Sequence, residues 1–322
     1  MTKMHLQQTE VLAWSQNYLK ENGYQLQNSP EIIHNGPWST VYRILTNFGT
    51  LYLKQTAPDF AIEPTLLRYL GTLLPSASLE VLAQNDKLYC FLMRDAGTPL
   101  RDILKKHFQI NLANNALTTY ATIQKLTANH IDTLLSMGVP DWRLSMLPSL
   151  YLALLNQKQF LIDDGLSPTE IEDLKKLHLK VVERCHQLAQ YNIPETIEHG
   201  DFHDNNILVQ GNNMIIHDWG EATITHPFFS LTSYLYSALR VHNFNEASDT
   251  YKDILNGYLN NWLIFENHDK LVEATKLAHQ LGYIKFALAH YRIAQCPGFM
   301  ELGQYKGRLT QALQSCLKEI NN

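Results

Sequence analysis

The chain has 322 residues, a length that predicts two domains or one fold with two lobes and excludes a peptide or a minimal binding module. Apolar residues make up 45% of the sequence and charged residues 18%, a composition that excludes a disordered chain. The formal charge is -5 and the 26 basic residues are spread thinly, so nothing indicates a surface for nucleic acid or for an anionic membrane.

The cysteines and the first residues of the chain indicate the cellular compartment in which we expect the protein. The cysteines are far apart and form no CxxC pair, so the sequence predicts neither a zinc site nor a disulfide framework. They are Cys90, Cys185, Cys296 and Cys316. Residues 1–19 lack the continuous apolar stretch of a signal peptide, and no 18 apolar residues run together. We therefore expect a cytoplasmic protein with reduced thiols and no membrane partner.

The first third of the chain predicts a small α+β lobe. Residues 5–22 carry apolar side chains at an imperfect helical spacing and end before Gly23, which is typical of a helix. Short apolar runs separated by turns then predict an antiparallel meander, a helix and a buried strand. The strands are expected at residues 32–34, 41–45, 50–54 and 88–93, and the helix at 63–73.

Beyond Pro99 the sequence becomes mostly helical. Helical patterns cover residues 114–137, 142–162, 167–191, 228–241 and 269–294. The third begins with Ser167-Pro168-Thr169-Glu170, a capping box with proline at the first helical position. The fold class we predict is α+β, with an N-terminal lobe in residues 1–95 and a helical lobe in 96–322.

A polar cluster interrupts the helical texture. Residues 198–206 read EHGDFHDNN and are followed by two short apolar runs around an Asn/Gly turn, which predicts a β-hairpin. If the turn is centred near Asn212, Asn206 and Asp218 lie opposite each other, with Cβ atoms roughly 5 Å apart. Two oxygen ligands without a thiolate favour Mg²⁺ or Mn²⁺ shared with substrate phosphates. Asp201, in the loop before the hairpin, is placed to act as a base on a substrate hydroxyl.

These residues resemble the aminoglycoside phosphotransferase and choline kinase family, a branch of the protein-kinase-like fold. Residues 199–206, HGDFHDNN, match the family's HGDxHxxN loop. Residues 216–219, IHDW, match its second metal motif, with His217 as an extra residue before Asp218. The resemblance implies a two-lobed kinase-like fold whose N-terminal lobe binds the nucleotide.

The resemblance also implies a nucleotide site in the N-terminal lobe. Lys54 would contact the α- and β-phosphates of ATP, with GTP as the alternative, and Glu63 would pair with the lysine. A strand-end lysine is usually solvated, and the helix that begins with Glu63 nine residues later favours the pairing. Residues 35–40 would cover the phosphates, with the hydroxyls of Ser39 and Thr40 compensating for the missing N–H of Pro37. The main chain of four residues would hold the adenine: Met93, Arg94, Asp95 and Ala96.

One segment departs from the family pattern. After the second motif, the family usually continues with GDPxxDLA, whereas here His226 and Ser230 replace the two aspartates. An interaction that steadies the catalytic loop is therefore absent or rebuilt.

Other polar residues near the motifs have competing interpretations. For His203, a structural role in the loop and a direct role in the reaction are equally supported by the sequence. Asp204 is better interpreted as a solvated loop acid than as a ligand. Glu221 is either a substrate or second metal contact, or a carboxylate that approaches a helix.

The leading functional hypothesis is an ATP-dependent small-molecule kinase. A pseudokinase that only binds nucleotide is one alternative, although Asp201, Asn206, Asp218 and Lys54 are all present. A metal-dependent phosphoesterase is another, since Asp201-Phe-His203 matches a D-x-H motif, but the further ligand segment that it needs is missing. Protein substrates are disfavoured, because few residues separate Asp218 from the helix expected near Pro227.

The distribution of charge favours a neutral or cationic hydroxyl acceptor. Residues 185–239 contain no Lys or Arg. The same stretch holds six acids: Glu195, Glu198, Asp201, Asp204, Asp218 and Glu221. An anionic acceptor would find no basic clamp there, unless residues from later helices such as Lys285 or Arg292 reach the site.

Overall fold

The computed structural model describes residues 3–321, which divide into two compact units. Of the described residues, the N-terminal unit comprises 3–98 and 208–220. The helical unit comprises 99–207 and 221–321. The hairpin that the sequence analysis assigned to the C-terminal lobe thus packs mainly with the N-terminal unit.

A five-stranded antiparallel sheet in the order β1-β2-β3-β5-β4 forms the body of the N-terminal unit. Its strands are β1 (Glu31–Asn35), β2 (Ser39–Thr46), β3 (Gly49–Thr56), β4 (Val81–Asn85) and β5 (Cys90–Arg94). β2 and β3 pair over their whole length, from Ser39 opposite Thr56 to Thr46 opposite Gly49. The predicted meander is confirmed; β4, which pairs with β5, was not predicted.

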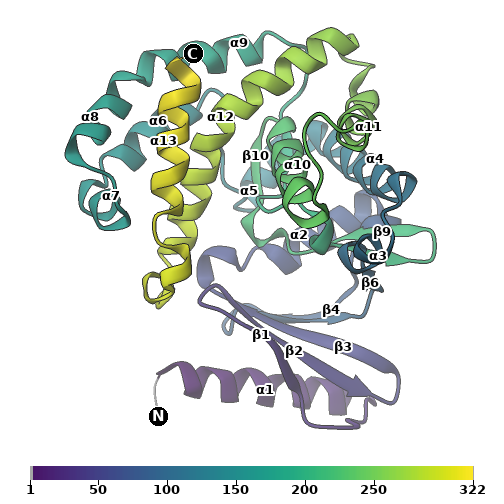
Figure 1. The fold of residues 1–322 in the computed structure, drawn as a ribbon. Helices are drawn as coiled ribbons and strands as arrows, with labels where there is room; N and C mark the ends of the chain where they lie inside the picture. Colours follow the sequence, from purple (N-terminus) through teal and green to yellow (C-terminus); the bar gives the residue numbers. More distant parts are fainter. Residues whose placement is uncertain (1–2, 322) are drawn as a thin grey trace. The chain divides into compact units, whose positions relative to one another are not determined.

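Helix α1 (Lys3–Glu21) lies along one face of this sheet (Figure 1). The apolar side chains of the helix and the sheet form one buried cluster. It consists of Val11, Leu19, Tyr42, Ile44, Leu51, Leu53, Cys90 and Leu92. Burial of this apolar surface, at about 25 cal/mol per Å², holds the helix on the sheet.

Two further pieces of the N-terminal unit carry candidate site residues. Helix α2 (Glu63–Leu73) begins at Glu63 and buries Leu66, Leu67 and Leu70. The hairpin consists of β8 (Ile207–Gln210) and β9 (Asn213–Ile216), with β6 (Thr98–Pro99) beside β8. These strand limits centre the turn between Gly211 and Asn212, half a residue earlier than the sequence analysis assumed.

The helical unit contains eleven α-helices among the described residues. They are α3 (Leu100–Lys106), α4 (Ile110–Thr127), α5 (Ile131–Ser136), α6 (Leu147–Leu155), α7 (Lys158–Asp164), α8 (Pro168–Lys176), α9 (His178–Ala189), α10 (Phe228–His242), α11 (Asp249–Leu259), α12 (His268–Ala294) and α13 (Arg308–Asn321). Two short strands, β7 (Thr196–Glu198) and β10 (Thr223–Thr225), pair antiparallel within this unit. The mixed α+β class is confirmed.

Three of the long helices that the sequence predicted are divided in the structure. The pattern over 167–191, for example, forms α8 and α9, which separate at Leu177 with φ -73° and ψ -10°. The backbone at Leu177 stays near helical values, so the break needs neither glycine nor proline. The apolar spacing also continues across it, and the sequence therefore carries no signal of the break. The capping box at Ser167 and Glu170 is present as predicted.

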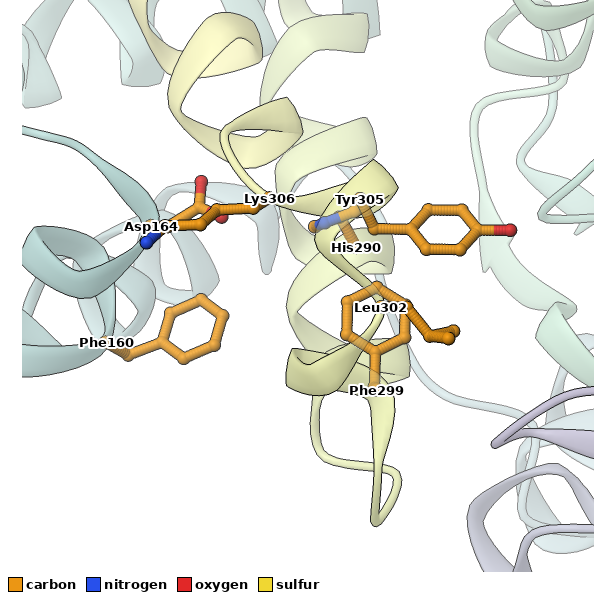
Figure 2. Close-up of a pocket in the computed structure, with 7 residues that line it drawn as sticks. All are labelled: Phe160, Asp164, His290, Phe299, Leu302, Tyr305 and Lys306. Carbon is orange, nitrogen blue, oxygen red and sulfur yellow. The ribbon is translucent and has the colours of Figure 1, made fainter.

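Helices α12 and α13 lie side by side, and a buried carboxylate fixes the start of α13 (Figure 1). Asp164, at the end of α7, accepts hydrogen bonds from the N–H groups of Gly307 and Thr310 and from the Thr310 hydroxyl, each at 2.9 Å. Figure 2 shows the small cavity beside this contact, lined by Phe160, Asp164, His290, Phe299, Leu302, Tyr305 and Lys306. Its volume of about 10 Å³ leaves room for one water molecule, so the cavity belongs to the packing of α13.

None of the helices within residues 3–321 has the length and apolarity that crossing a bilayer requires.

Candidate active site

A cluster of three charged side chains, two of them buried, lies in the N-terminal unit. Lys54 extends from β3, Glu63 begins α2, and Asp218 follows β9. The Lys54 ammonium is 2.6 Å from the Glu63 carboxylate and also donates a hydrogen bond to Oδ1 of Asp218. Lys54 and Glu63 are buried, whereas 47% of the Asp218 side chain is exposed. The cluster therefore has one carboxylate inside and one that faces solvent.

The charges of this cluster control each other's titration. Burial alone would lower the pKa of Lys54, but the carboxylates of Asp218 and Glu63 outweigh it and raise that pKa. Burial and the nearby Asp218 raise the pKa of Glu63, against the pull of Lys54. A single ammonium thus serves two carboxylates.

The turn expected to cover the phosphates is compact. Gly36 donates its N–H to the carbonyl of Ser39 at 2.8 Å. The Thr40 hydroxyl donates to Oδ1 of Asn35 at 3.0 Å, and both Ser39 and Thr40 are buried. The Thr40 hydroxyl is therefore already committed to the turn, which makes it a weaker partner for phosphate than the sequence suggested.

The segment expected to hold the adenine ends β5. Met93 lies opposite Tyr52 of β3 and Val81 of β4. The N–H groups of Arg94 and Asp95 donate to the carbonyls of Glu80 and Thr50. These main-chain donors serve the sheet, which leaves Ala96, a buried residue, as the candidate closest to the end of the strand.

In the helical unit, the loop from His199 to Asn206 presents Asp201. Its side chain is 54% exposed, and Nε2 of His203 lies 3.2 Å from its carboxylate. Asn206 donates its amide to the Asp201 carbonyl at 2.9 Å, so its side-chain oxygen is the atom that could bind a cation. The arrangement is that of an oriented, solvent-facing carboxylate, as a general base requires.

His203 acts on the Asp201 side chain rather than on the backbone. Burial would lower the pKa of His203, but the hydrogen bond and charge of Asp201 outweigh it, so the net shift is upward. The histidine thus favours the ionised form of Asp201.

A tight turn at Gly200 brings this loop against Glu221. Gly200 has φ +92°, a left-handed conformation, and a Cβ there would lie 2.4 Å from the Cβ of Glu221. Only glycine fits this position. Glu221, whose role the sequence left open, therefore packs against the loop beside Asp201.

The prediction for Asp204 was wrong. Its carboxylate is buried, with Nε of Arg101 and Nε2 of His242 each 2.7 Å away. Both partners come from helices far from Asp204 in sequence, α3 and α10, so only the tertiary fold reveals that this acid is structural.

At the departure from the family pattern, Ser230 belongs to a buried network. The network includes Lys285, which the sequence analysis named as able to reach the acidic stretch. The Ser230 hydroxyl donates to Glu198 at 2.8 Å and lies 2.6 Å from the Tyr120 hydroxyl. Lys285 of α12 lies 3.0 Å from Glu198, which is fully buried. The sequence signal for this network was Glu198 itself, an acid directly after Ile197, because a charge that becomes buried needs a partner.

The acidic stretch finds its counter-ions outside itself. Glu198 pairs with Lys285, Asp204 with Arg101, and Asp218 with Lys54. The gap in basic residues over 185–239 therefore does not leave these three acids uncompensated. Each of the three cations is also occupied by the acid that it faces.

His226 provides a test of the packing behind the loop. It is fully buried, its Nδ1 accepts the N–H of Phe228 at 3.3 Å, and its Nε2 has no hydrogen-bond partner among the described residues. Burial lowers its pKa from 6.5 to about 3. The unfolded chain therefore binds a proton between these pH values that the folded chain does not, so stability falls as the pH drops from 6.5 toward 3.

We expect His226→Asn, which retains an acceptor for Phe228, to remove this pH dependence. Between pH 7 and pH 5 the variant should lose about 2 kcal/mol less unfolding free energy than the parent. Urea unfolding at the two pH values measures the difference, with the exposed His107→Asn as the control. Equal losses in the parent and in His226→Asn would show that His226 titrates normally in the folded protein.

The described residues contain no group of three or more His, Cys, Asp or Glu side chains that could hold a metal ion.

The model of a family described as the phosphotransferase enzyme family, APH, matches residues 33–263. A search of curated protein sequences found no match.

Solved structures share the fold at low sequence identity. An amicoumacin kinase in complex with AMP-PNP, Ca²⁺ and Ami is 14% identical, with a TM-score of 0.59, over 94% of this chain and 93% of its own. An APH(2") structure with GDP and kanamycin is 14% identical, with a TM-score of 0.60, over 96% and 98%. An ethanolamine kinase from Plasmodium vivax is 12% identical, with a TM-score of 0.61, over 91% and 84%.

Proposed function

Because this chain belongs to the phosphotransferase enzyme family, we propose that it transfers the γ-phosphate of ATP to a hydroxyl of a small molecule. The observation that carries the proposal is the cluster of Lys54, Glu63 and Asp218. A buried ammonium held by an equally buried glutamate is costly to desolvate, and in phosphotransferases such a lysine binds the α- and β-phosphates. GTP is the alternative donor, since the APH(2") relative is described with GDP.

Asp201 is the proposed general base. Its exposed carboxylate, with Nε2 of His203 3.2 Å away, would accept the proton of the acceptor hydroxyl as the oxygen attacks phosphorus. The proposed role of His203 is then to orient the carboxylate of Asp201.

Asn206 and Asp218 are the proposed holders of Mg²⁺. The amide oxygen of Asn206 and the half-exposed carboxylate of Asp218 are hard oxygen donors of the kind that Mg²⁺ prefers. When bound, the ion would neutralise charge on the phosphate oxygens. Glu63, which is buried and 2.6 Å from the Lys54 ammonium, would hold this lysine in place for the phosphates.

The other proposed contacts to the nucleotide also come from the N-terminal unit. Ser39 and Thr40 begin β2 beside the turn that would cover the phosphates. The main chain of Met93, Arg94, Asp95 and Ala96 would lie along the adenine, with Ala96 favoured because the donors of Arg94 and Asp95 serve the sheet.

The acceptor is proposed to be neutral or cationic. The basic side chains that face the acidic stretch, Lys54, Arg101 and Lys285, are each engaged by a carboxylate. An anionic acceptor would have to displace one of these pairs, whereas an amine would be attracted by the exposed Asp201.

A phosphoryl-transfer screen tests the function and the acceptor class together. We expect acceptor-dependent ADP formation with amino alcohols, aminoglycosides, sugars or nucleosides. The best substrate should be neutral or cationic, and for a cationic one the KM should rise with ionic strength. A best substrate with net negative charge would refute the acceptor class. Binding of MgATP without transfer to any acceptor would favour the pseudokinase hypothesis.

A further inference from the structure

A buried ion pair in the helical unit lies directly behind Asp201. Glu198 is fully buried and Lys285 is 4% exposed. Their charged groups are 3.0 Å apart. Replacing such a pair with apolar residues is often neutral or stabilising, so stability alone does not explain why two charges lie here.

Both charged groups form hydrogen bonds with the backbone of Gly200, the residue that precedes Asp201. Glu198 accepts the N–H of Gly200 at 3.0 Å, and Lys285 donates to the carbonyl of Gly200 at 2.8 Å. That carbonyl belongs to the same planar peptide as the N–H of Asp201, which donates to Nδ1 of His199 at 3.3 Å. The peptide is therefore held at its oxygen and at its nitrogen.

A second layer fixes the carboxylate itself. Ser230 donates to Oε1 of Glu198, while the other oxygen faces Lys285 and Gly200. Tyr120, which contacts Ser230, accepts the N–H of His199 at 3.0 Å. Its ring also stacks on Phe202 with centroids 3.7 Å apart. Residues on both sides of Gly200 and Asp201 are thus tied to one buried network.

We propose that Lys285 is a positioning residue that, with Glu198 as its counter-ion, sets the orientation of the Gly200–Asp201 peptide and so the direction of the Asp201 carboxylate. The proposal rests on the function of Asp201 proposed above. Lys285 acts through the peptide and not on substrate. Gly200 has a left-handed backbone and no side chain to limit it, so this peptide depends on external hydrogen bonds for its orientation.

The decisive variant is the double substitution Glu198→Gln with Lys285→Met. It leaves no unpaired buried charge. The amide oxygen of the introduced glutamine can still accept the N–H of Gly200, while its NH2 group can donate to the Ser230 hydroxyl, and Lys285→Met removes the donor to the Gly200 carbonyl. We expect kcat to fall by about 10- to 100-fold with KM for ATP within twofold, because a small misplacement of a reacting group costs rate rather than binding. Lys125→Met is the matched control, since Lys125 also donates from a helix to a main-chain carbonyl, that of Asn261.

Hydrogen exchange supplies a readout that does not need turnover. In the double variant, the amides of residues 199–203 should exchange at least about tenfold faster than in the parent, with the exchange of β7, α4 and α12 unchanged. Unchanged exchange in the loop, or unchanged kcat in a folded variant of an active parent, would overturn the proposal. If the parent transfers phosphate to no acceptor, the proposed function fails, and the exchange result still decides whether Lys285 holds the loop.

Discussion

Asp201→Asn is expected to lower kcat by about 10² to 10⁴, the contribution typical of one positioned base. The amide has the same shape as the carboxylate and can still contact His203, which lies 3.2 Å away, but it cannot accept the acceptor's proton. Binding of MgATP should be nearly unchanged, because the charge cluster of Lys54, Glu63 and Asp218 does not include Asp201.

The measurement is kcat on the acceptor identified by the screen, with nucleotide affinity determined in parallel. Asp173→Asn is the control, since Asp173 pairs with Lys176 on the exposed face of α8 and such pairs contribute little. If Asp201→Asn turned over at the parental rate, another group would have to be the base.

Asp218→Asn is expected to abolish the part of nucleotide binding that depends on a divalent cation. ATP should raise the Tm of the parent more with Mg²⁺ or Mn²⁺ than without. A ligand at one hundred times its Kd adds about 2.7 kcal/mol to the unfolding free energy, enough to observe. In the variant, ATP with and without Mg²⁺ should give the same Tm. Asparagine is chosen because Asp218 has φ +67°, a backbone conformation that asparagine tolerates better than alanine.

Asp86→Asn, in an exposed turn of the same unit, should respond to MgATP as the parent does. A full Mg²⁺-dependent shift in Asp218→Asn would instead place the cation elsewhere. Tight binding of Zn²⁺ without nucleotide would favour the phosphoesterase hypothesis.

The two motifs, residues 199–206 and 216–219, could be recognised in the sequence because the residues that form each of them are close along the chain. Residues 199–206 follow one another in a single loop, and Asn206 and Asp218 flank one short hairpin, so their order and spacing carry the resemblance. The strands of the meander were equally legible, because each forms hydrogen bonds to a neighbour only a turn away.

The roles of residues whose partners are distant in the sequence could not be predicted. Asp204 resembled any polar loop acid until α3 and α10 supplied Arg101 and His242. Helix breaks such as that at Leu177 were missed for a related reason, since packing against other helices permits a turn that apolar spacing does not record.

By itself, the sequence determined the α+β class, the loop that carries Asp201 and the family to which the chain belongs. Apart from the Lys54–Glu63 pair, which the resemblance implied, only the tertiary structure decided which charged groups neutralise each other. Lys285 lies 85 residues from the Gly200 carbonyl that it binds, and Lys54 lies 164 residues from Asp218. Electrostatic pairing depends on distance in space and on exclusion of water, and neither is encoded in the spacing of residues along a chain.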